Sequence, residues 1–477
     1  MPGMNRNNDG RLFVVANRLP VTITQTEDGQ FQYTMAAGGL VSALQGLSKS
    51  MEFQWFGWPG TEIHRNDRET VRQELATRFK AVPIFLPKET AERHYNGFSN
   101  SVLWPLLHSM PSKAEFNEGW AIAYREVNEM FADNIVPFVE DGDIIWIHDY
   151  HLLLLPAVLR KRLANRRSVR IGFFLHTPFP SDDSFAVLPL REDICDGLLS
   201  CNLVGLHVRE YVEKLLDSAA KVLPGVRRSP SDLHYNDRKL DVQEFPIGIA
   251  PDDFRDSLAS EATQSEMRHL SREFHGKQII LGVDRLDYIK GIPQKLRAYE
   301  KLLTDHPEMR EKVVLIQVAI PTRTDVEEYK MLRKQVEGMI GMINGKHGTF
   351  TYTPIRYLYR SLNLEQLHAL YAVSDVCLVS SIKDGLNMVC YEYIASQQVN
   401  RRGVLVLSQY AGAATLLPSA VLFNPYDIPR FTDAIFTALK MPQEDRQSRL
   451  DAAVKTVNTL TRQVFSFYSA RVSSSSR

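Results

Sequence analysis

The sequence predicts an α/β protein of two domains, each built on a parallel sheet, with a ligand-binding cleft between them. Short, apolar, β-branched runs alternate with segments of helical period along most of the 477 residues. This alternation is typical of parallel sheets that are covered by helices on both faces. A polar, turn-rich stretch near the middle divides the pattern into two halves, each of ordinary domain size.

The strands follow from short runs that are apolar without interruption. We expect eight of them, at Leu12–Ala16, Asp143–Ile147, Arg170–Leu175, Leu203–Leu206, Gln278–Val283, Val313–Ala319, Val376–Val379 and Val404–Leu407. Helical periodicity predicts helices between them, for example at Asn117–Phe138, Gln294–Leu303 and Asp325–Gly341. The runs VTITQ and FQYTM flank the turn signal EDGQ and predict a hairpin.

The boundary between the domains is expected near Pro246–Pro251. Before it, Val226–Asp241 is polar and rich in turn residues, which we interpret as a surface loop. The first domain then covers residues 1–248, with residues 1–10 expected to be disordered, and the second covers 249–455.

Composition excludes several classes of function. The 56 basic and 56 acidic residues cancel, which argues against nucleic acid or an anionic membrane as a partner of the whole surface. Four scattered cysteines without CxxC spacing predict buried reduced thiols, no disulfide framework and no zinc site. No apolar leader and no apolar run of transmembrane length is found, so we expect a cytoplasmic protein.

Polar residues follow the predicted strands, at the sheet edge where open parallel sheets bind ligands. Four of them are cations, Arg18, Arg285, Lys290 and Arg323. Arginine offers a planar fork that matches phosphate, and lysine acts as a point charge. Surface salt bridges explain any one of these residues equally well, but four cations at strand ends favour an anion-binding site.

Other candidates carry weaker signals. Gly38 and Gly39 precede a helical run and would allow an anion to approach the backbone, although a plain helix start looks the same. Asp384 lies in a loop and Glu392 about two turns inside the following helix, where either a sugar diol or a salt bridge would partner the carboxylate. Trp55 and Trp58 suit sugar stacking, but core filling explains them better.

A set of ordered motifs connects these residues. They are NRLPV, GGL, WFGWPG, HYNGFSNSVLWP, IHDYHLLLLP, GFFLHTPFP, FPIGI, DRLDYIKG, PTRTDVEEY, KDGLNMVCYEY and SQYAGAA. Together, from about residue 11 to about residue 460, they resemble the trehalose-6-phosphate synthases of glycosyltransferase family 20, in the fungal, single-activity form.

The resemblance implies a GT-B fold, with two Rossmann-like domains facing a central cleft and a C-terminal segment, residues 456–477, that crosses back to the first domain. It implies retaining transfer of glucose from UDP-glucose to glucose 6-phosphate, with no cofactor and no metal. A homo-oligomer or a subunit of a trehalose synthase complex would also fit the family.

The family's site residues match positions in both halves. The donor UDP-glucose would be bound by Gly38, Gly39, His176, Arg285, Lys290, Asp384, Gly385, Leu386, Asn387, Met388 and Glu392. The acceptor glucose 6-phosphate would be bound by Arg18, Tyr95, Trp104, Asp149 and Arg323, and the catalytic residues would be Arg285, Lys290, Asp149 and His176. The implied mechanism is front-face attack, with a phosphate oxygen of the leaving UDP accepting the proton of the acceptor hydroxyl.

Some positions depart from the family pattern. Leu386 and Met388 stand where methionine and leucine are usual, Lys383 replaces arginine, and Tyr359 stands where histidine is common. None of these changes removes a residue with an implied catalytic role. Two alternatives to an active synthase stay open. One is a non-catalytic regulatory subunit, and the other is a sister transferase with a different phosphorylated acceptor.

Overall fold

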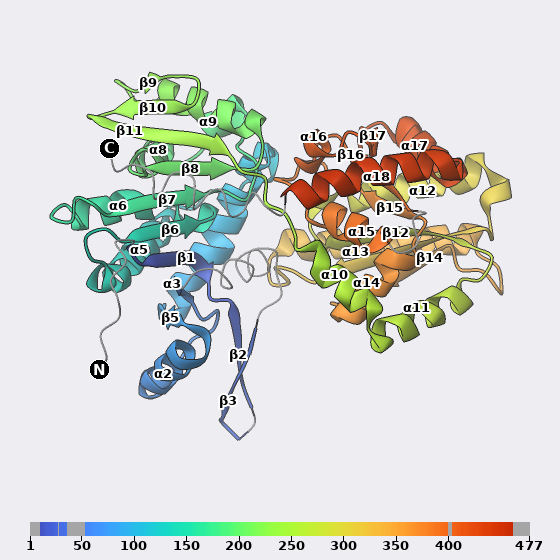
Figure 1. Cartoon of the computed structure of the whole chain (residues 1–477), viewed down its shortest axis with the longest axis horizontal. Helices are drawn as coiled ribbons and strands as arrows, with labels where there is room; N and C mark the ends of the chain where they lie inside the picture. Colours follow the sequence, from blue (N-terminus) through green and yellow to red (C-terminus); the bar gives the residue numbers. More distant parts are fainter. Residues whose placement is uncertain (1–9, 27, 36–52, 399–402, 461–477) are drawn as a thin grey trace. The chain divides into compact units, whose positions relative to one another are not determined.

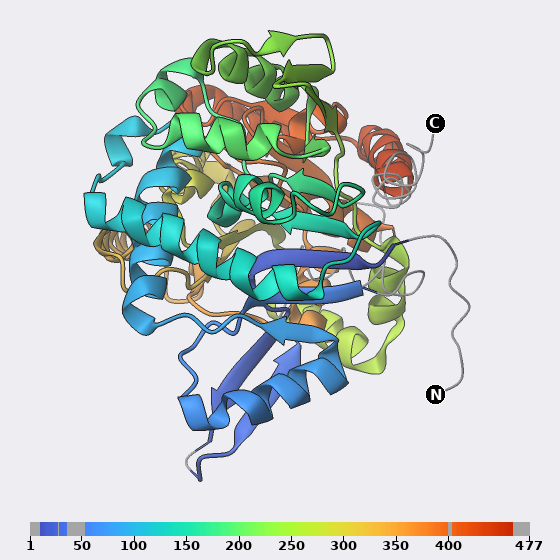
Figure 2. The ribbon, with the colours of Figure 1, turned by 90° about the vertical axis from the view of Figure 1, so that its left-hand side faces the viewer.

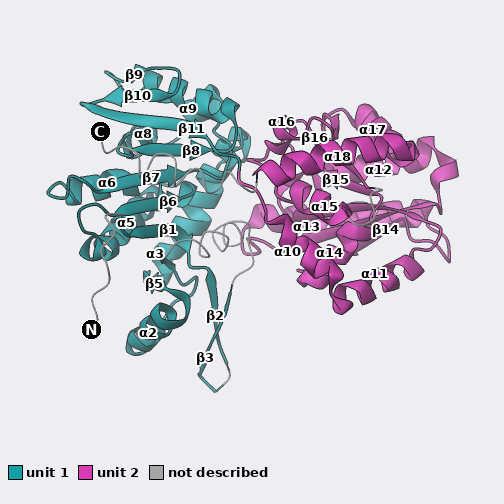
Figure 3. Cartoon of the chain, viewed as in Figure 1, with its two compact units in different colours: residues 1–246, 463–477 teal, residues 247–462 magenta. Residues whose placement is uncertain are grey.

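The computed structural model describes residues 10–26, 28–35, 53–398 and 403–460. The chain divides into two compact units at Pro246 and Ile247 (Figure 3). The first unit holds the described residues up to Pro246, and the second begins at Ile247. The division therefore falls at the start of the segment in which the sequence places the hinge.

The first unit is built on a nine-stranded sheet with the order β5-β4-β1-β6-β7-β8-β11-β10-β9 (Figure 1). From β5 to β11 every neighbouring pair is parallel. The central strands β1 and β6 are buried along nearly their whole length, as expected for a sheet covered on both faces. The strands are β1 Leu12–Arg18, β4 Phe53–Trp58, β5 Ala81–Pro83, β6 Ile144–His148, β7 Arg170–Phe174, β8 Leu203–Leu206, β9 Arg227–Arg228, β10 Asp232–Tyr235 and β11 Arg238–Glu244.

The predicted surface loop at Val226–Asp241 is wrong, because this stretch forms three strands. β10 pairs antiparallel with both β9 and β11, and β11 joins the parallel sheet beside β8. The turn residues Asn236 and Asp237 both have positive φ, at 49° and 61°, which is the conformation of a tight hairpin turn. Leu233 of β10 and Leu240 of β11 are buried, so each of these mostly polar strands places an apolar side chain in the core.

The predicted hairpin is confirmed. β2 (Val21–Gln25) pairs antiparallel with β3 (Phe31–Met35), in the register Val21 to Met35 through Gln25 to Phe31. It forms a separate two-stranded ribbon that extends away from the large sheet beside α2 (Figures 1 and 2). The ring of Tyr33 lies 6.4 Å from that of Phe79 on α2.

The helices of the first unit alternate with its strands along the chain. They are α2 Arg68–Phe79, α3 Lys88–Glu92, α4 Trp104–Leu107, α5 Glu118–Ile135, α6 Leu155–Arg162, α7 Asp182–Ala186, α8 Arg191–Leu199 and α9 Arg209–Val222. Between α3 and α4 the chain forms a π-helix, Arg93–Leu103. Such wide turns are rare and are frequently found at functional sites.

The second unit is built on a six-stranded sheet with the order β14-β13-β12-β15-β16-β17, in which all pairs are parallel. Its strands are β12 Gln278–Arg285, β13 Val313–Ile320, β14 Ile355–Leu358, β15 Val376–Val379, β16 Val404–Ser408 and β17 Val421–Phe423. Because β17 follows β16, the loop with Ala411 and Gly412 lies between the last two strands of the sheet.

Helices cover both faces of this second sheet. Ile279, Leu281 and Val283 of β12 join one apolar core, while Ile280 of the same strand joins another, so the two faces are packed separately. The helices are α10 Pro251–Ala259, α11 Glu261–Glu273, α12 Ile292–Asp305, α13 Glu327–His347, α14 Leu364–Val373, α15 Val389–Gln397, α16 Ala413–Leu416, α17 Ile428–Lys440 and α18 Gln443–Leu460.

The start of the predicted crossing segment, residue 456, lies inside α18. Val457 and Leu460 of this helix pack in the core of the second unit. Residues 461–477 lie outside the described part of the chain, so the crossing itself stays a prediction. All four cysteines are buried and unpaired.

A glycine in α8 provides a test of packing in the first unit. A Cβ added at Gly197 would lie 2.1 Å from the carbonyl oxygen of Leu153. We therefore expect Gly197→Ala to destabilise this unit by roughly 1–3 kcal/mol, the usual effect of overpacking. All five tryptophans lie between Trp55 and Trp146, so tryptophan fluorescence during urea unfolding measures the loss.

Gly338→Ala in α13 is the matched control. This glycine is exposed, and an added Cβ would meet nothing within 4 Å. The control should leave the fluorescence transition in place. An unchanged transition in Gly197→Ala would contradict the packing argument.

Candidate functional site

Both sheets share the strand order of a doubly wound fold, and this order defines one candidate site in each unit. Counted along the chain, the parallel strands lie in the order 3-2-1-4-5-6-7 in the first sheet and 3-2-1-4-5-6 in the second, so in both the first strand is flanked by the second and the fourth. The connections leave in opposite directions at that point, and ligands bind outside the carboxyl ends of these two strands. We call these positions the switch points. They lie between β1 and β6 and between β12 and β15.

Arg18 ends β1 at the first switch point. Its guanidinium lies 4.7 Å from the ring centre of Trp58 and 5.5 Å from that of Tyr95. Gly60 has a φ of 87°, and a Cβ there would lie 2.1 Å from Nη1 of Arg18, so a glycine is required beside this cation. No carboxylate of the described residues forms an ion pair with Arg18. Aromatic rings hold the cation in place without neutralising it.

The π-helix and α4 supply the aromatic residues of this site. Tyr95 stacks on His151, with ring centres 5.6 Å apart and planes inclined by 8°. Trp104 is only 6% exposed and packs against His108 and Tyr150. Its predicted contact with an acceptor sugar stays a prediction. Trp55 is buried in the core as expected, whereas Trp58 is partly exposed and its ring contacts the guanidinium of Arg18.

Asp149 follows β6 on the other side of the switch point, in a strained conformation. Its φ of 73° and ψ of 167° lie in a region that is almost reserved for glycine and costs about 1–3 kcal/mol. Its amide donates to the carbonyl of Phe174, and its Oδ1 accepts from the amide of His176 at 3.3 Å. Such strain persists only where the surroundings enforce it, which is typical of functional sites.

Three histidines lie at or just beyond the carboxyl ends of the neighbouring strands β6, β7 and β8. His148 Nδ1 and His176 Nε2 share a hydrogen bond of 3.1 Å, and the ring of His207 lies 5.6 Å from that of His176. Burial lowers the pKa of His148 to about 3. Burial and the two neighbouring imidazoles lower the pKa of His176 well below its ordinary value. The rings of His148 and His176 are therefore neutral at physiological pH, and each offers one donor and one acceptor.

The structure adds two residues that sequence analysis had not assigned a role. Asn17 is 5% exposed and Thr177 is 3% exposed, and the polar side-chain atoms of both lack a hydrogen-bond partner. Buried polar atoms are almost always paired, so unpaired ones at a switch point mark places for ligand groups. Their position near the carboxyl ends of β1 and β7 was the available signal.

At the second switch point, the two loops lie in direct backbone contact. Gly291 has a φ of 65°, and a Cβ there would lie 2.1 Å from the carbonyl oxygen of Ser380. Ile382 donates its amide to the carbonyl of Ile289, and the hydroxyl of Ser380 donates to the carbonyl of Lys290 at 2.8 Å. The loop with Arg285 and Lys290 is therefore held against the loop with Asp384.

Lys290 and Asp384, both predicted donor-binding residues, form an ion pair. Nζ of Lys290 lies 2.5 Å from Oδ2 of Asp384, and the two side chains are only 12% and 13% exposed. Ser381 and Asn387 also donate to this oxygen, at 2.9 and 3.0 Å. Asn387 has a φ of 80°, a conformation that asparagine tolerates better than most residues.

The loop at residues 385–388 leads into α15. A Cβ at Gly412 would lie 2.0 Å from the carbonyl oxygen of Gly385, and Ala413 donates its amide to the carbonyl of Leu386. Leu386 is buried and Met388 packs against the same core. Both residues that depart from the family pattern therefore contribute apolar side chains to the packing.

Glu392 lies in the first turn of α15, not two turns inside a helix, because α15 begins at Val389. Its partner is the hydroxyl of Tyr371, which donates to Oε2 at 2.8 Å. Burial raises the pKa of Glu392, and the bond from Tyr371 opposes this shift. No ion pair to Glu392 is found among the described residues, so the salt-bridge alternative loses support.

Arg323 is brought to Asp287 within the second unit. Its Nη1 lies 3.0 Å from Oδ2 of Asp287, and the two side chains are 2% and 0% exposed. The predicted role of Arg323 in acceptor binding stays a prediction. Gly38 and Gly39 lie outside the described residues.

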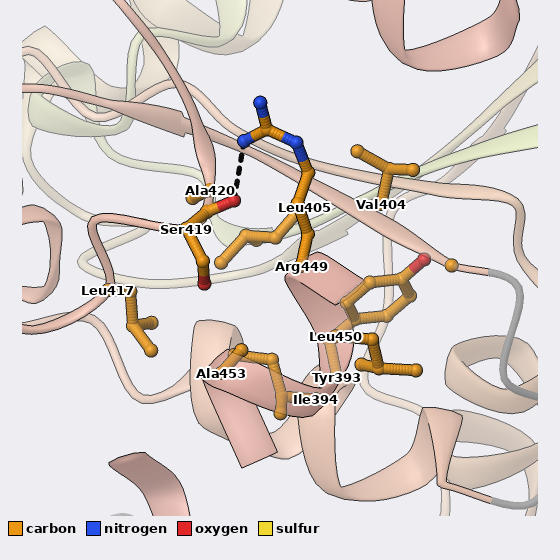
Figure 4. A pocket seen from close by; sticks show the side chains of 11 residues that line it. Tyr393, Ile394, Val404, Leu405, Leu417, Ser419, Ala420, Arg449, Leu450 and Ala453 are labelled. Atoms are coloured by element: carbon orange, nitrogen blue, oxygen red, sulfur yellow. Dashed lines mark hydrogen bonds between the residues drawn. The ribbon is translucent and has the colours of Figure 1, made fainter. Parts of the chain in front are cut away.

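A small cavity in the second unit does not resemble a substrate site. It lies between β16, α15 and α18, is lined in part by Arg449, and has a volume of about 20 Å³, enough for a water molecule (Figure 4).

In the described residues, no cluster of three or more histidine, cysteine or carboxylate side chains is arranged to hold a metal ion. None of the helices in the described ranges combines the length and apolarity needed to cross a membrane.

Comparison with known proteins gives a consistent result. The sequence pattern of glycosyltransferase family 20 matches residues 10–467. The chain is 47% identical to an α,α-trehalose-phosphate synthase (UDP-forming) of Aspergillus fumigatus, over 97% of this chain and 90% of that protein.

Solved structures agree. One from Escherichia coli, described as trehalose-6-phosphate bound with UDP-2-fluoro glucose, has a TM-score of 0.88 and 33% identity, over 97% of this chain and 99% of that one. A Burkholderia xenovorans α,α-trehalose-phosphate synthase in complex with glucose-6-phosphate has a TM-score of 0.86 and 30% identity, over 97% and 100%. These matches and the two Rossmann-ordered sheets confirm the predicted GT-B fold class.

The Lys290–Asp384 pair can be tested by its stability. Asp384→Asn leaves Lys290 in a largely buried position without its counter-charge, and we expect a loss of roughly 3 kcal/mol, as for other broken buried pairs. Thermal unfolding followed by circular dichroism measures it.

Asp305→Asn is the matched control in the same unit. Asp305 pairs with Lys301 on the surface, where the side chains are 42% and 39% exposed. Its loss should cost less than about 1 kcal/mol. Equal losses of stability in the two variants would show that breaking the Lys290–Asp384 pair costs no more than breaking an exposed ion pair.

Proposed function

The chain belongs to glycosyltransferase family 20, and we propose that it transfers glucose from UDP-glucose to glucose 6-phosphate, with retention, in trehalose biosynthesis. The products are α,α-trehalose 6-phosphate and UDP. The observation that carries the proposal is that each unit has cations at its switch point, Arg18 in the first and Arg285 with Lys290 in the second. Both substrates are anions.

The donor belongs to the second unit in this proposal. Arg285 and Lys290 bind the diphosphate of UDP-glucose, and Glu392 accepts hydrogen bonds from the ribose hydroxyls. The amides of residues 385–388 lie at the start of α15, where free N–H groups and the helix dipole favour negative charge. Asp384 and the loop with Gly38 and Gly39 complete the donor set.

The acceptor belongs to the first unit. Arg18 binds the phosphate of glucose 6-phosphate together with Tyr95, whose ring lies against the guanidinium. Asp149 and Trp104 contact the sugar. Arg323 of the second unit contributes a further positive charge to the acceptor phosphate.

The chemistry follows from where charge develops. The glycosidic bond to UDP breaks as the acceptor hydroxyl approaches on the same face, and the leaving phosphate oxygen takes its proton. Negative charge grows on the diphosphate in the transition state, so Arg285 and Lys290 stabilise that state more than the ground state. His176 is neutral because of its lowered pKa, so it can hydrogen-bond a donor hydroxyl without adding charge.

The activity is tested directly. Purified protein is incubated with UDP-glucose and glucose 6-phosphate, and UDP release and the disaccharide phosphate are measured. We expect both products in equal amounts. Product with glycerol 3-phosphate but none with glucose 6-phosphate would favour the sister transferase, and no product with either would favour a regulatory subunit.

Arg285→Ala tests the diphosphate role. Loss of one charge-stabilising donor should lower kcat about 10²- to 10³-fold, with the thermal transition retained. Arg297→Ala is the control, because Arg297 is an exposed arginine on α12 of the same unit. Near-normal turnover by Arg285→Ala would refute the assigned role.

Cytoplasmic location, and assembly as a homo-oligomer or within a trehalose synthase complex, also belong to this proposal. Light scattering of the purified protein distinguishes the monomer from a homo-oligomer.

A further inference from the structure

Asp287 uses its two carboxylate oxygens in two different directions. Oδ1 accepts from the amide of Ile289 at 3.2 Å and so caps the short 3₁₀ turn Tyr288–Lys290. Oδ2 accepts from Nη1 of Arg323 at 3.0 Å. The side chain of Asp287 is fully buried. One carboxylate therefore joins the turn with Lys290 to the loop with Arg323.

The loop with Arg323 is held in a defined conformation. Arg323 has a φ of 47°, which is uncommon for a residue other than glycine. Its carbonyl accepts from the amide of Val326, which begins the turn into α13. Because the side chain is 2% exposed, its direction is fixed by Asp287 and by the hydroxyl of Tyr329, to which Nη1 also donates.

Tyr329 supports the same carboxylate from α13. Its hydroxyl donates to Oδ2 of Asp287 at 3.3 Å. Burial and the charge of Asp287 raise the pKa of Tyr329 above its ordinary value, so the hydroxyl keeps its proton as a donor. The backbones of the two strands reinforce the link, because Leu286 after β12 donates its amide to the carbonyl of Ile320 on β13.

The two ends of this connection have different proposed ligands. On one side Lys290, with Arg285 before the turn, binds the diphosphate of the donor. On the other side Arg323 binds the phosphate of the acceptor. A shift of the turn when the diphosphate binds moves Asp287, and Asp287 cannot move without moving Arg323, since a buried charge must keep its partner.

From this arrangement we infer that Asp287 is a positioning residue that couples donor binding to acceptor binding, so that UDP in its site tightens the binding of glucose 6-phosphate. The inference rests on the proposed function. Coupling of this kind is reciprocal, so glucose 6-phosphate must tighten UDP binding by the same factor.

The test measures this coupling factor in the full chain by calorimetry. It is the ratio of the Kd for glucose 6-phosphate without UDP to the Kd with saturating UDP, a pair of ligands that does not react. For the unaltered protein we expect a factor of about 5 or more, as is usual for coupled sites. The Kd for UDP with and without glucose 6-phosphate must give the same factor.

Asp287→Asn is the decisive variant. The amide oxygen can still accept from Ile289, but the neutral amide cannot hold the charge of Arg323. We expect the coupling factor to fall to near 1. Tyr329→Phe is the second variant, because it removes only the hydroxyl that supports the carboxylate, and we expect an intermediate factor.

Matched controls separate coupling from general damage. Asp375→Asn makes the same chemical change directly before β15, at the amino ends of the strands of the same sheet. There the carboxylate accepts from the amide of Ile279. Tyr352→Phe removes a buried hydroxyl that donates to the carbonyl of Val313. Both controls should keep the coupling factor of the unaltered protein, even if their thermal stability falls.

Turnover of UDP-glucose and glucose 6-phosphate by the unaltered protein is measured in parallel. Normal turnover together with an unchanged coupling factor in folded Asp287→Asn, or no coupling in the unaltered protein, overturns the inference and leaves the proposed function standing. Absence of turnover in the unaltered protein overturns both. Loss of coupling in Asp287→Asn and its retention in Asp375→Asn support the inference.

Discussion

The order in which the strands join each sheet is the constraint on which the rest of the structure depends. In both units the first parallel strand lies between the second and the fourth, so the connections that follow the first and the fourth strand leave in opposite directions. Side chains cannot fill the space outside that end as they do between neighbouring crossovers. Arg18 and Asp149 occupy this place in the first unit, and Arg285 and Asp384 occupy it in the second. The residues lie far apart in sequence, and the strand order alone brings each pair together.

Around the second switch point, three carboxylates are buried, and each is paired with a cation. Asp284 pairs with Lys295, Asp287 with Arg323, and Asp384 with Lys290. Buried ion pairs rarely add net stability, because desolvation offsets the attraction, whereas removing one partner is costly. Such pairs are therefore best understood as fixing geometry.

The Asp284–Lys295 pair illustrates this role. Both side chains are at most 1% exposed, and Gln317 of β13 bonds to both of them. The pair joins β12 and β13 to the first turn of α12, directly beneath the loop with Arg285. A rigid base of this kind lets the loop above it carry positive charge in a fixed place.

Much of this could be predicted from sequence. All eight expected strands are present, with ends within two residues of the prediction, because buried parallel strands are continuous apolar runs. The short strands β5, β14 and β17 are not predicted, because none of them is an uninterrupted apolar run of four residues. β4 is not predicted either, because its tryptophans are considered only for sugar stacking or core filling. The stretch that forms β9, β10 and β11 is predicted as a loop because its charged side chains outnumber its buried leucines.

The sequence predicts the candidate site as a list of residues, which stays a prediction, but it does not predict the contacts among them. The position of Arg18 indicated an anion site, and the family resemblance placed Tyr95 in the same acceptor set, yet nothing in the sequence predicts the contact of Arg18 with the ring of Trp58. Lys290 and Arg323 were predicted as ligand-binding cations, and the structure pairs both with carboxylates of their own unit. Ion pairing depends on side-chain distances across loops some 36 to 94 residues apart in the chain, and no local pattern encodes them.

The pairing of Lys290 with Asp384 also explains how a cation can be held beside its ligand site before the ligand binds. Asp384 accepts hydrogen bonds from Ser381 and Asn387 as well as from Lys290. If Lys290 turned toward a diphosphate, the carboxylate would keep two of these donors and would not be left as a bare buried charge. Asp384 is therefore satisfied in both states, so a phosphate can share Lys290 at little cost. Arg18 needs no such partner, because aromatic rings hold a cation without competing with a phosphate for its hydrogen bonds.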